Sequence, residues 1–178
     1  MKPAAFCLLL AVTLSAQAIS EDSAVSRLRL TLNRIKAETI HEPVSLVIAV
    51  QTNDATLATL ARVRDLGLML QPLVTNDRGE IAILSYGDQV RTVQPFTSDS
   101  ANAALAIAGL KVNGTSARKI DAVGEAISYL DMQPSNRQRV ILVVGQSKDQ
   151  GSETNLTNFH DAMIRAQRSN VLIYSLAF

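Results

Sequence analysis

The chain has 178 residues, of which 47% are hydrophobic and 19% are charged, and this composition excludes an intrinsically disordered protein. The length is sufficient for one domain with a sizeable core. Seventeen basic residues stand against 16 acidic ones, so the formal net charge is close to zero. This balance argues against nucleic acid and against an anionic membrane surface as the main partner.

Residues 1–18 have the pattern of a secretory signal peptide. Lys2 supplies a positive start, Ala4 to Leu14 is a largely apolar run, and Ala16-Gln17-Ala18 is a small-x-small cleavage pattern. The alternative is an uncleaved anchor, although the run is short for a membrane span. Cleavage would remove the only cysteine, Cys7, and one lysine, which leaves 16 basic and 16 acidic residues. We therefore expect a secreted or periplasmic protein without a disulfide and without a membrane span in the mature chain.

Residues 19–42 form an N-terminal segment with two possible patterns. Leu28, Leu30 and Leu32 alternate as in a strand, and Asn33 offers a turn. A helical face is the alternative, made by Val25, Leu28, Leu32 and Ile35. We favour a short hairpin.

The next part of the chain predicts a strand, a helix and two further strands. The apolar run from Pro43 to Val50 is typical of a strand buried on both faces. A helix capped by Thr52 or Asp54 follows, and its apolar stripe contains Leu57, Leu60, Val63, Leu66 and Leu70. A buried strand is expected at residues 80–86, and the turn Gly87-Asp88 should return the chain as an antiparallel edge strand at residues 89–93.

The remaining elements complete an alternating pattern of helices and strands. Helices are expected from Ser98 or Asp99 to Leu110, over residues 117–130, and after a Thr154 cap, where Leu156 would lie inside the helix. Strands are expected at residues 140–144 and 171–176. The pattern predicts an α/β fold with a mainly parallel, Rossmann-like central sheet, one antiparallel edge strand and helices on both faces. The final strand would lack cover at its outer edge, so we expect either truncation or cover from a partner.

Four segments resemble a von Willebrand factor A domain, of the subgroup found in secreted bacterial proteins. They are PVSLVIAVQTND, EIAILSYGDQV, KIDAVGEAI and RVILVVGQSKDQGSET, and together they span about residues 43–176. The resemblance implies a von Willebrand A-like domain over residues 43–178. It also implies binding of protein ligands, which this family commonly carries out through a divalent metal.

The family's metal motif is altered in this chain. The motif consists of an Asp-x-Ser-x-Ser loop, a threonine and a second aspartate. The matching positions here are Gln51, Asn53 and Ala55, then Thr115, Ser116 or Ala117, and finally Gln146. Mg²⁺ prefers carboxylate oxygens, which offset the cost of its dehydration, and amides are neutral. We therefore predict a degenerate site without metal or other cofactor.

The predicted function is a non-enzymatic, protein-binding module whose ligand site lies at the carboxyl ends of the strands. The candidate ligand-binding residues are Gln51, Thr52, Asn53, Asp54, Thr115, Ser116, Gln146, Ser147 and Asp149. For Asp149 itself, we favour the stabilisation of its own turn over a direct contact with a ligand. Two other functions stay open: a serine hydrolase using Ser147, with His160 as a conceivable base, and a structural component of a secreted assembly.

Overall fold

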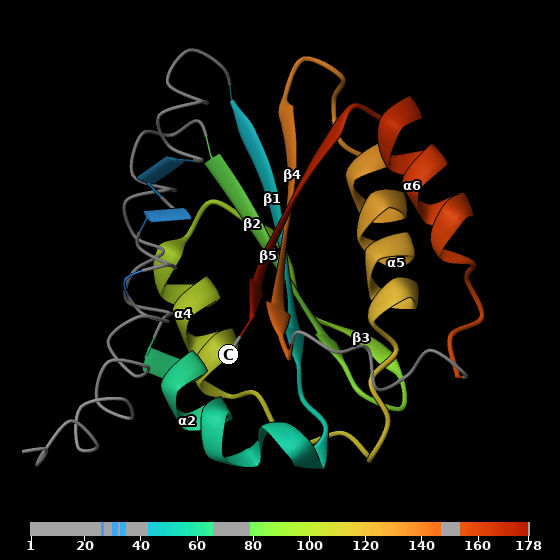
Figure 1. Ribbon diagram of the computed structural model, residues 1–178. Coiled ribbons are helices and arrows are strands. Elements are labelled where there is room, and N and C mark those ends of the chain that lie inside the picture. The colour runs from blue at the N-terminus through green and yellow to red at the C-terminus, as the bar shows by residue number, and fades with distance from the viewer. Residues whose placement is uncertain are drawn as a thin grey trace, which may run out of the picture.

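The structure is a computed structural model that describes residues 43–65, 79–146 and 154–177, together with residues 26, 30, 31, 33 and 34. Five strands form one sheet in the order β3-β2-β1-β4-β5 (Figure 1). Their bounds are Val44–Gln51 (β1), Gly79–Tyr86 (β2), Val90–Thr97 (β3), Gln138–Gly145 (β4) and Val171–Ala177 (β5). β3 pairs with β2 in the antiparallel sense, and the other neighbours are parallel. The predicted fold class is confirmed.

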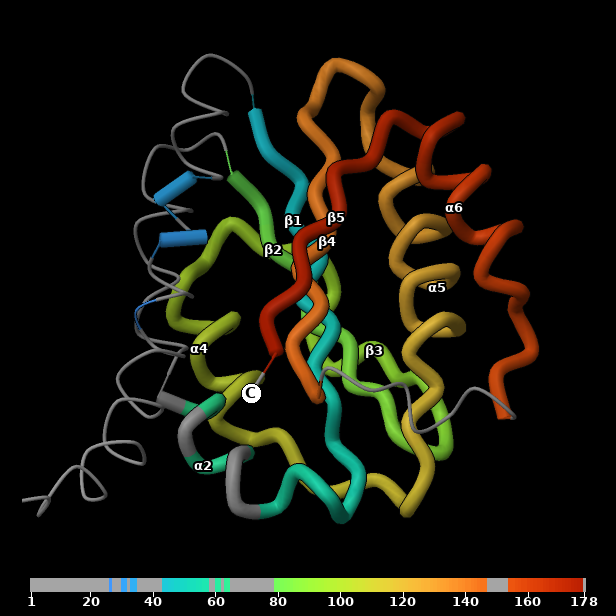
Figure 2. Tube along the Cα trace, viewed as in Figure 1, coloured from blue at the N-terminus to red at the C-terminus, as the bar shows by residue number. Residues whose placement is uncertain are grey.

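Helices cover both faces of this sheet (Figures 1 and 2). They are α2 (Leu57–Asp65), α4 (Ser100–Ala108), α5 (Lys119–Asp131) and α6 (Phe159–Arg168), and a short 3-10 turn, η1 (Asp54–Thr56), precedes α2. One face carries α2 and α4, and the other carries α5 and α6. The arrangement explains why β1 and β4 are apolar almost throughout, because neither face of the central strands meets water.

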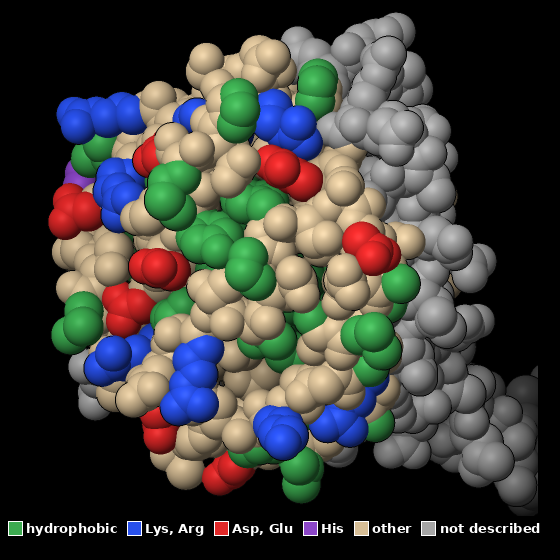
Figure 3. Space-filling model, turned by 180° about the vertical axis from the view of Figure 1, so that it is seen from behind, with side chains coloured by type: hydrophobic (Ala, Val, Ile, Leu, Met, Phe, Trp, Pro, Cys, Tyr) green, Lys and Arg blue, Asp and Glu red, His purple; other side chains and the backbone are tan. Residues whose placement is uncertain are grey.

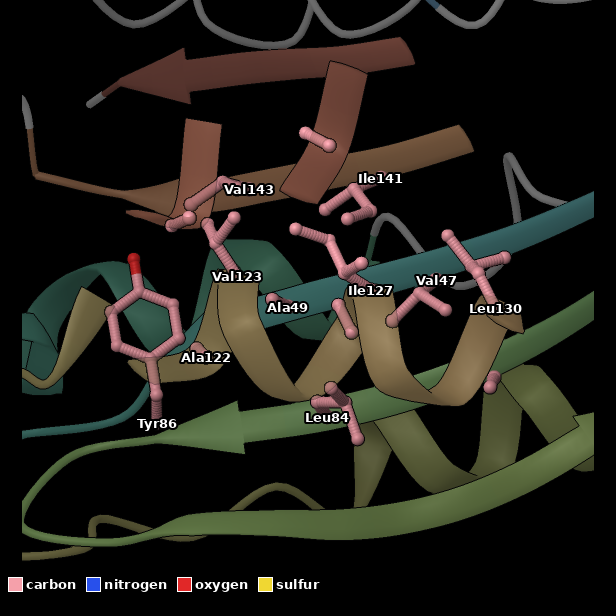
Figure 4. Packing of buried hydrophobic residues seen from close by; sticks show 14 of the residues in the cluster. Val47, Ala49, Leu84, Tyr86, Ala122, Val123, Ile127, Leu130, Ile141 and Val143 are labelled. Carbon is pink, nitrogen blue, oxygen red and sulfur yellow. The ribbon is translucent and has the colours of Figure 1, made fainter. Parts of the chain in front are cut away.

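Alternate side chains of β1 enter two separate cores. Leu46, Ile48 and Val50 pack with residues of α2 and α4. Val47 and Ala49 belong to the other core, where Val123, Ile127 and Leu130 of α5 lie against the sheet (Figure 4). All of these side chains are buried, as expected for an apolar helical stripe on a parallel sheet.

A charged network joins the amino ends of β1, β2 and β4. The Nε of Arg137 donates to the hydroxyl of Ser45 at 2.7 Å and lies 3.2 Å from Oε1 of Glu80. The same Glu80 oxygen accepts a 2.6 Å hydrogen bond from Ser45, and Arg137 Nη2 donates to the carbonyl of Val44. We call Ser45, Glu80 and Arg137 the amino-end network.

The helix starts show where local sequence signals succeeded and failed. Asp99 caps α4 as predicted, since its side chain accepts from the backbone N–H groups of Ala101 and Asn102. The predicted Thr154 cap is wrong: Asn158 caps α6 by accepting from His160 N–H, so Leu156 lies before the helix. The stretch Asn155-Leu156-Thr157 instead serves the start of α5, a tertiary role that no local pattern signals.

Little of the N-terminal segment lies within the described residues. Ser26, Leu30, Thr31, Asn33 and Arg34 are helical, so a hairpin strand does not fit those positions and the helical alternative does. The predicted signal peptide and its cleavage site lie outside the described residues, as do Leu66 and Leu70 of the predicted stripe. The boundaries at residues 18 and 42 stay predictions.

Candidate functional site

The candidate ligand residues lie at the end of β1 and in three loops: after β1, between α4 and α5, and after β4. The first two loops and the start of the third meet at the carboxyl end of the sheet, at the bottom of Figures 1 and 2. Strands β1 and β4 are parallel neighbours, so their last residues, Gln51 and Gly145, lie at the same edge. The loop between α4 and α5 reaches this edge as well, through a 2.9 Å hydrogen bond from Asp54 N–H to the carbonyl of Gly114. Ser147 and Asp149 lie outside the described residues.

The side-chain amide of Gln51 is the centre of this meeting point. Its Nε2 donates to Oδ1 of Asn53 at 2.9 Å, and its Oε1 accepts from Gln146 N–H at 2.8 Å. Asn53 in turn donates through Nδ2 to the carbonyl of Thr115 at 3.1 Å. We call Gln51, Asn53 and Gln146 the carboxyl-end network. It ties the ends of β1 and β4 to the 113–117 loop with neutral groups.

Close packing holds the Gln51 amide in place. A Cβ added at Gly145 would lie 2.5 Å from Oε1 of Gln51 and would overlap the hydroxyl of Tyr86. Tyr86 is fully buried at the end of β2, and its hydroxyl donates to the carbonyl of Val144. The glycine at the end of β4 is therefore needed for space.

Burial divides the candidate ligand residues into two groups. Gln51, Thr52 and Asn53 are at most 1% exposed, so in this structure they hold loops together and do not face solvent. Asp54 and Thr115 are exposed, and Ser116 and Gln146 are half-buried. Thr52 donates to the carbonyl of Tyr86 at 3.3 Å, which adds β2 to the set of elements joined here.

Asp88 fixes the loop between α4 and α5, a role that the sequence analysis missed. Its Oδ1 accepts from the N–H groups of Thr115 and Ser116 and from the Ser116 hydroxyl. The Ser116 N–H and hydroxyl, with smaller help from Thr115 N–H and Arg118, lower the pKa of Asp88 against a weaker opposing effect of desolvation. The loop also requires Gly114, whose φ is +80° and whose missing Cβ leaves room for the Asp88 carboxylate.

A reciprocal cap joins the first turn of α5 to residues 155–157. The side-chain Oδ1 of Asn155 accepts from the N–H groups of Ile120 and Asp121, and the Asp121 carboxylate accepts from the N–H groups of Leu156 and Thr157. Burial is the largest single influence on the pKa of Asp121 and raises it. The hydrogen bonds from Leu156 and Thr157, with Arg118, outweigh burial and lower the pKa overall.

The family resemblance implies a divalent cation here, and the described residues do not fit one. The side chains at the matching positions of β1 and β4 are amides. Gln51 Oε1 accepts from Gln146 N–H and Asn53 Oδ1 accepts from Gln51 Nε2, whereas Oε1 of Gln146 is buried without a hydrogen-bond partner and offers a single neutral oxygen. Within residues 43–65, 79–146 and 154–177, no group of three or more His, Cys, Asp or Glu side chains is placed to hold a metal. Lys119 also donates to the carbonyl of Gln146 at 2.7 Å, so a cationic group already lies beside the β4 end.

Other surface features agree with the charge balance of the sequence. On the face opposite to that in Figure 1, basic and acidic side chains are interspersed (Figure 3).

His160 is exposed on the first turn of α6, and its suggested partner Ser147 lies outside the described residues, so the hydrolase alternative stays a prediction. None of the helices in the described part of the chain has the length and apolarity needed to cross a bilayer.

Comparison with solved structures identifies the fold as that of a von Willebrand factor A domain, as predicted. BatB from Bacteroides thetaiotaomicron is 17% identical, with a TM-score of 0.57, and the match covers 74% of this chain and 65% of that one. A von Willebrand factor type A protein from Catenulispora acidiphila is 18% identical, with a TM-score of 0.54 and coverages of 75% and 33%.

A third similar structure is the vWF domain of the type V pili tip protein Mfa5 from Porphyromonas gingivalis. It is 15% identical with a TM-score of 0.55, and the match covers 61% of this chain and 39% of that one. In a structure with three N-terminal domains of Mfa5, the matched part is 20% of the length. No protein-family model and no curated protein matches the sequence. At these identities the likeness establishes the fold.

Proposed function

We propose that the chain is a secreted or periplasmic, non-enzymatic protein-binding module that contacts its partner through the carboxyl end of the sheet without a metal ion. The observation that supports this proposal most is the Gln51 side chain. It makes hydrogen bonds with Asn53 and Gln146 at the positions where the family's motif places metal-binding side chains. A site held by its own amides is formed before a partner arrives and needs no cation to join its loops.

The partner would contact the exposed neighbours of the network. Asp54 and Thr115 are exposed, and their backbone groups are tied down by bonds to Gly114, Asp88 and Asn53. Ser116, Gln146, Ser147 and Asp149 complete the proposed surface. Gln51, Thr52 and Asn53 act as positioning residues beneath it. Loops held by a rigid sheet are a common place for binding surfaces.

Calorimetric titration of the protein with Mg²⁺, Ca²⁺ and Mn²⁺ tests the absence of a metal. We expect no binding tighter than about 1 mM, because neutral amides do not offset the dehydration of these ions. A 1:1 isotherm with a dissociation constant well below that value would contradict the metal-free proposal. EDTA-treated protein provides the baseline.

The binding surface is tested with a paired set of charge variants. The double variant Asp54→Arg/Thr115→Arg changes two exposed side chains at the site, and Glu125→Arg/Thr92→Arg makes the same kinds of change on α5 and β3. Both variants and the parent would be immobilised and exposed to extracellular extract in EDTA. We expect the parent and the control to retain the same protein, and the site variant to lose it. Equal retention by all three would refute the surface.

The hydrolase alternative is tested separately with an activated ester. Turnover that disappears in Ser147→Ala would establish it and overturn the non-enzymatic proposal. We expect no turnover above that of buffer.

A further inference from the structure

The two edge strands of the sheet differ in how they are protected against pairing. Exposed strand edges invite another strand, and proteins usually block them with charges, prolines or bulges. β3 has all three: Arg91 and Pro95 lie on it, and its register with β2 shifts between Ile81 and Ile83 and again between Ile83 and Leu84. This edge is blocked.

β5, at the opposite edge, has none of these features. Its sequence, VLIYSLA, contains no charged residue and no proline, and all seven residues pair with β4 in an unbroken register from Arg139↔Val171 to Gly145↔Ala177. Among the described residues, no strand lies on its outer side. A regular, uncharged edge of this length is suited to accept another strand.

We propose that the occupant of this edge is β5 of a second copy of the chain, paired in the antiparallel sense. The strand is self-complementary about Tyr174: Leu172 would face Leu176 of the other copy, and Tyr174 would face Tyr174. Directly opposed residues of antiparallel strands share a face, so on this face aliphatic and aromatic side chains would meet their own kind, while on the other face Ile173 would lie opposite Ser175. Because β5 has no charge, two copies meet without repulsion, whereas β3 carries the charged Arg91 on its strand.

The exposed flank of α6 extends the same surface. Ala162 and Ala166 are buried toward the sheet, and Arg165 donates to Ser128 of α5, so α5 lies on the Arg165 side. At 3.6 residues per turn, Phe159 and Met163 fall on the opposite flank, away from α5 and toward the β5 edge. Phe159 is 63% exposed and Met163 36%. The two-fold axis of the strand pair is perpendicular to the sheet, which places both α6 helices on one face with these flanks facing each other.

This inference does not depend on the proposed function, because it uses the side edge of the sheet and not its carboxyl end. Analytical ultracentrifugation of the full chain, in the form that an exporting host yields, tests it between about 1 and 100 μM, the range expected for a small interface. We expect a concentration-dependent dimer. A protein that stays monomeric throughout this range would overturn the proposal.

Two lysine variants decide whether β5 is the edge that pairs. Ser175→Lys places a charge at an exposed position of β5, and Thr92→Lys does the same on β3. We expect Ser175→Lys to be monomeric at 100 μM, because each lysine would lie opposite Ile173 of the other copy and diagonal to the other lysine, and Thr92→Lys to dimerise as the parent does. Dimerisation of Ser175→Lys with the affinity of the parent would overturn the proposal.

A third variant tests the α6 flank without altering the sheet. Phe159→Ser changes a side chain that is 63% exposed, so folding should be retained, which a thermal melt by circular dichroism would check for every variant. We expect Phe159→Ser to weaken dimerisation about tenfold, as the loss of a large apolar contact at an interface commonly does. An unchanged dimerisation constant would remove α6 from the interface and contradict the two-fold arrangement.

Discussion

The two ends of the same three strands are joined by opposite kinds of chemistry. At the amino ends of β1, β2 and β4, Arg137, Glu80 and Ser45 form a network of charged groups. At the carboxyl ends, the Gln51 and Asn53 side chains and the Gln146 backbone join β1, β4 and the 113–117 loop with neutral groups. Both networks cross strands that are distant in the sequence.

This difference predicts how strongly substitutions at each end of the strands lower the stability of the fold. The Arg137 and Glu80 side chains at the amino end are about one-fifth exposed, so water screens part of their interaction and the network can relax. The carboxyl-end amide of Gln51 is 1% exposed and packed between Gly145 and Asn53, so it has fixed partners and no solvent to replace them. We therefore expect steric changes at the carboxyl end to be the most damaging of all.

The largest effect is expected for Gly145→Ala. The added Cβ would overlap Tyr86 and Gln51, so the ends of β2 and β4 must separate. We expect the free energy of unfolding to fall by about 3 kcal/mol, as for an overpacked core, measured by urea titration. Gly124→Ala in α5 is the control: its nearest contact would be an ordinary 3.4 Å, so the change should be neutral or slightly stabilising. Equal losses in both variants would contradict the steric explanation.

The next largest effect is expected at the amino end, for Arg137→Met. Its removal leaves the Glu80 carboxylate with Ser45 but without its cation. We expect a loss of about 2 kcal/mol in the free energy of unfolding, below the value for a fully buried pair because both side chains are partly exposed. The double variant Arg137→Met/Glu80→Leu should recover part of this loss. A double variant less stable than the single one would mean that packing, not charge, dominates this end.

Gln51→Met removes the hydrogen bonds of the Gln51 amide and measures their contribution to stability at the carboxyl end. Methionine keeps the length of the side chain but leaves Asn53 Oδ1 and Gln146 N–H without their partner. We expect a loss of about 1–2 kcal/mol in thermal or urea unfolding. Gln89→Met, at an exposed position, should stay within about 0.5 kcal/mol of the parent. If addition of Mg²⁺ stabilised the parent and not Gln51→Met, the neutral network would be serving a cation after all.

The smallest effect is a pH dependence of the 113–117 loop. The folded-state pKa of Asp88 lies below its ordinary value of 3.8, so its bonds to Thr115 and Ser116 are complete above that pH and are lost as the pH falls through the lowered pKa. We expect the amide signals of Thr115 and Ser116 in NMR spectra to shift in this acidic range. In Asp88→Asn this titration should be absent, and an unchanged titration would assign it to another group.

The sequence predicted the sheet well because its strands carry strong local signals. The apolar runs of β1 and β4 and the Asp99 cap depend on neighbours in the chain, and each was found at its predicted place. The Thr154 cap failed because the competing partner is distant: the Asn155 side chain accepts from Asp121 N–H, 34 positions away, and the Asp121 carboxylate accepts from Leu156 N–H. Local pattern cannot indicate such an exchange.

The site shows the same division. Substitution of amides for acids was visible in Gln51 and Gln146, and it drew attention to the strand ends. The burial of Gln51, Thr52 and Asn53 was not visible, since polar residues after a strand usually face solvent. Asp88 was taken as a turn residue, although its main contacts are with Thr115 and Ser116, 27 and 28 positions away.

The reciprocal cap on α5 has a practical consequence for the segment at residues 147–153. Gln146 is anchored before it by the side chain of Gln51, and Asn155 is anchored after it by the first turn of α5. Between two such anchors, the closure entropy costs only about 0.6 kcal/mol more for each doubling of the number of residues that join them. We therefore expect a peptide grafted between these anchors to leave the pairing of β1 with β4 intact, which a urea titration of the grafted protein would check.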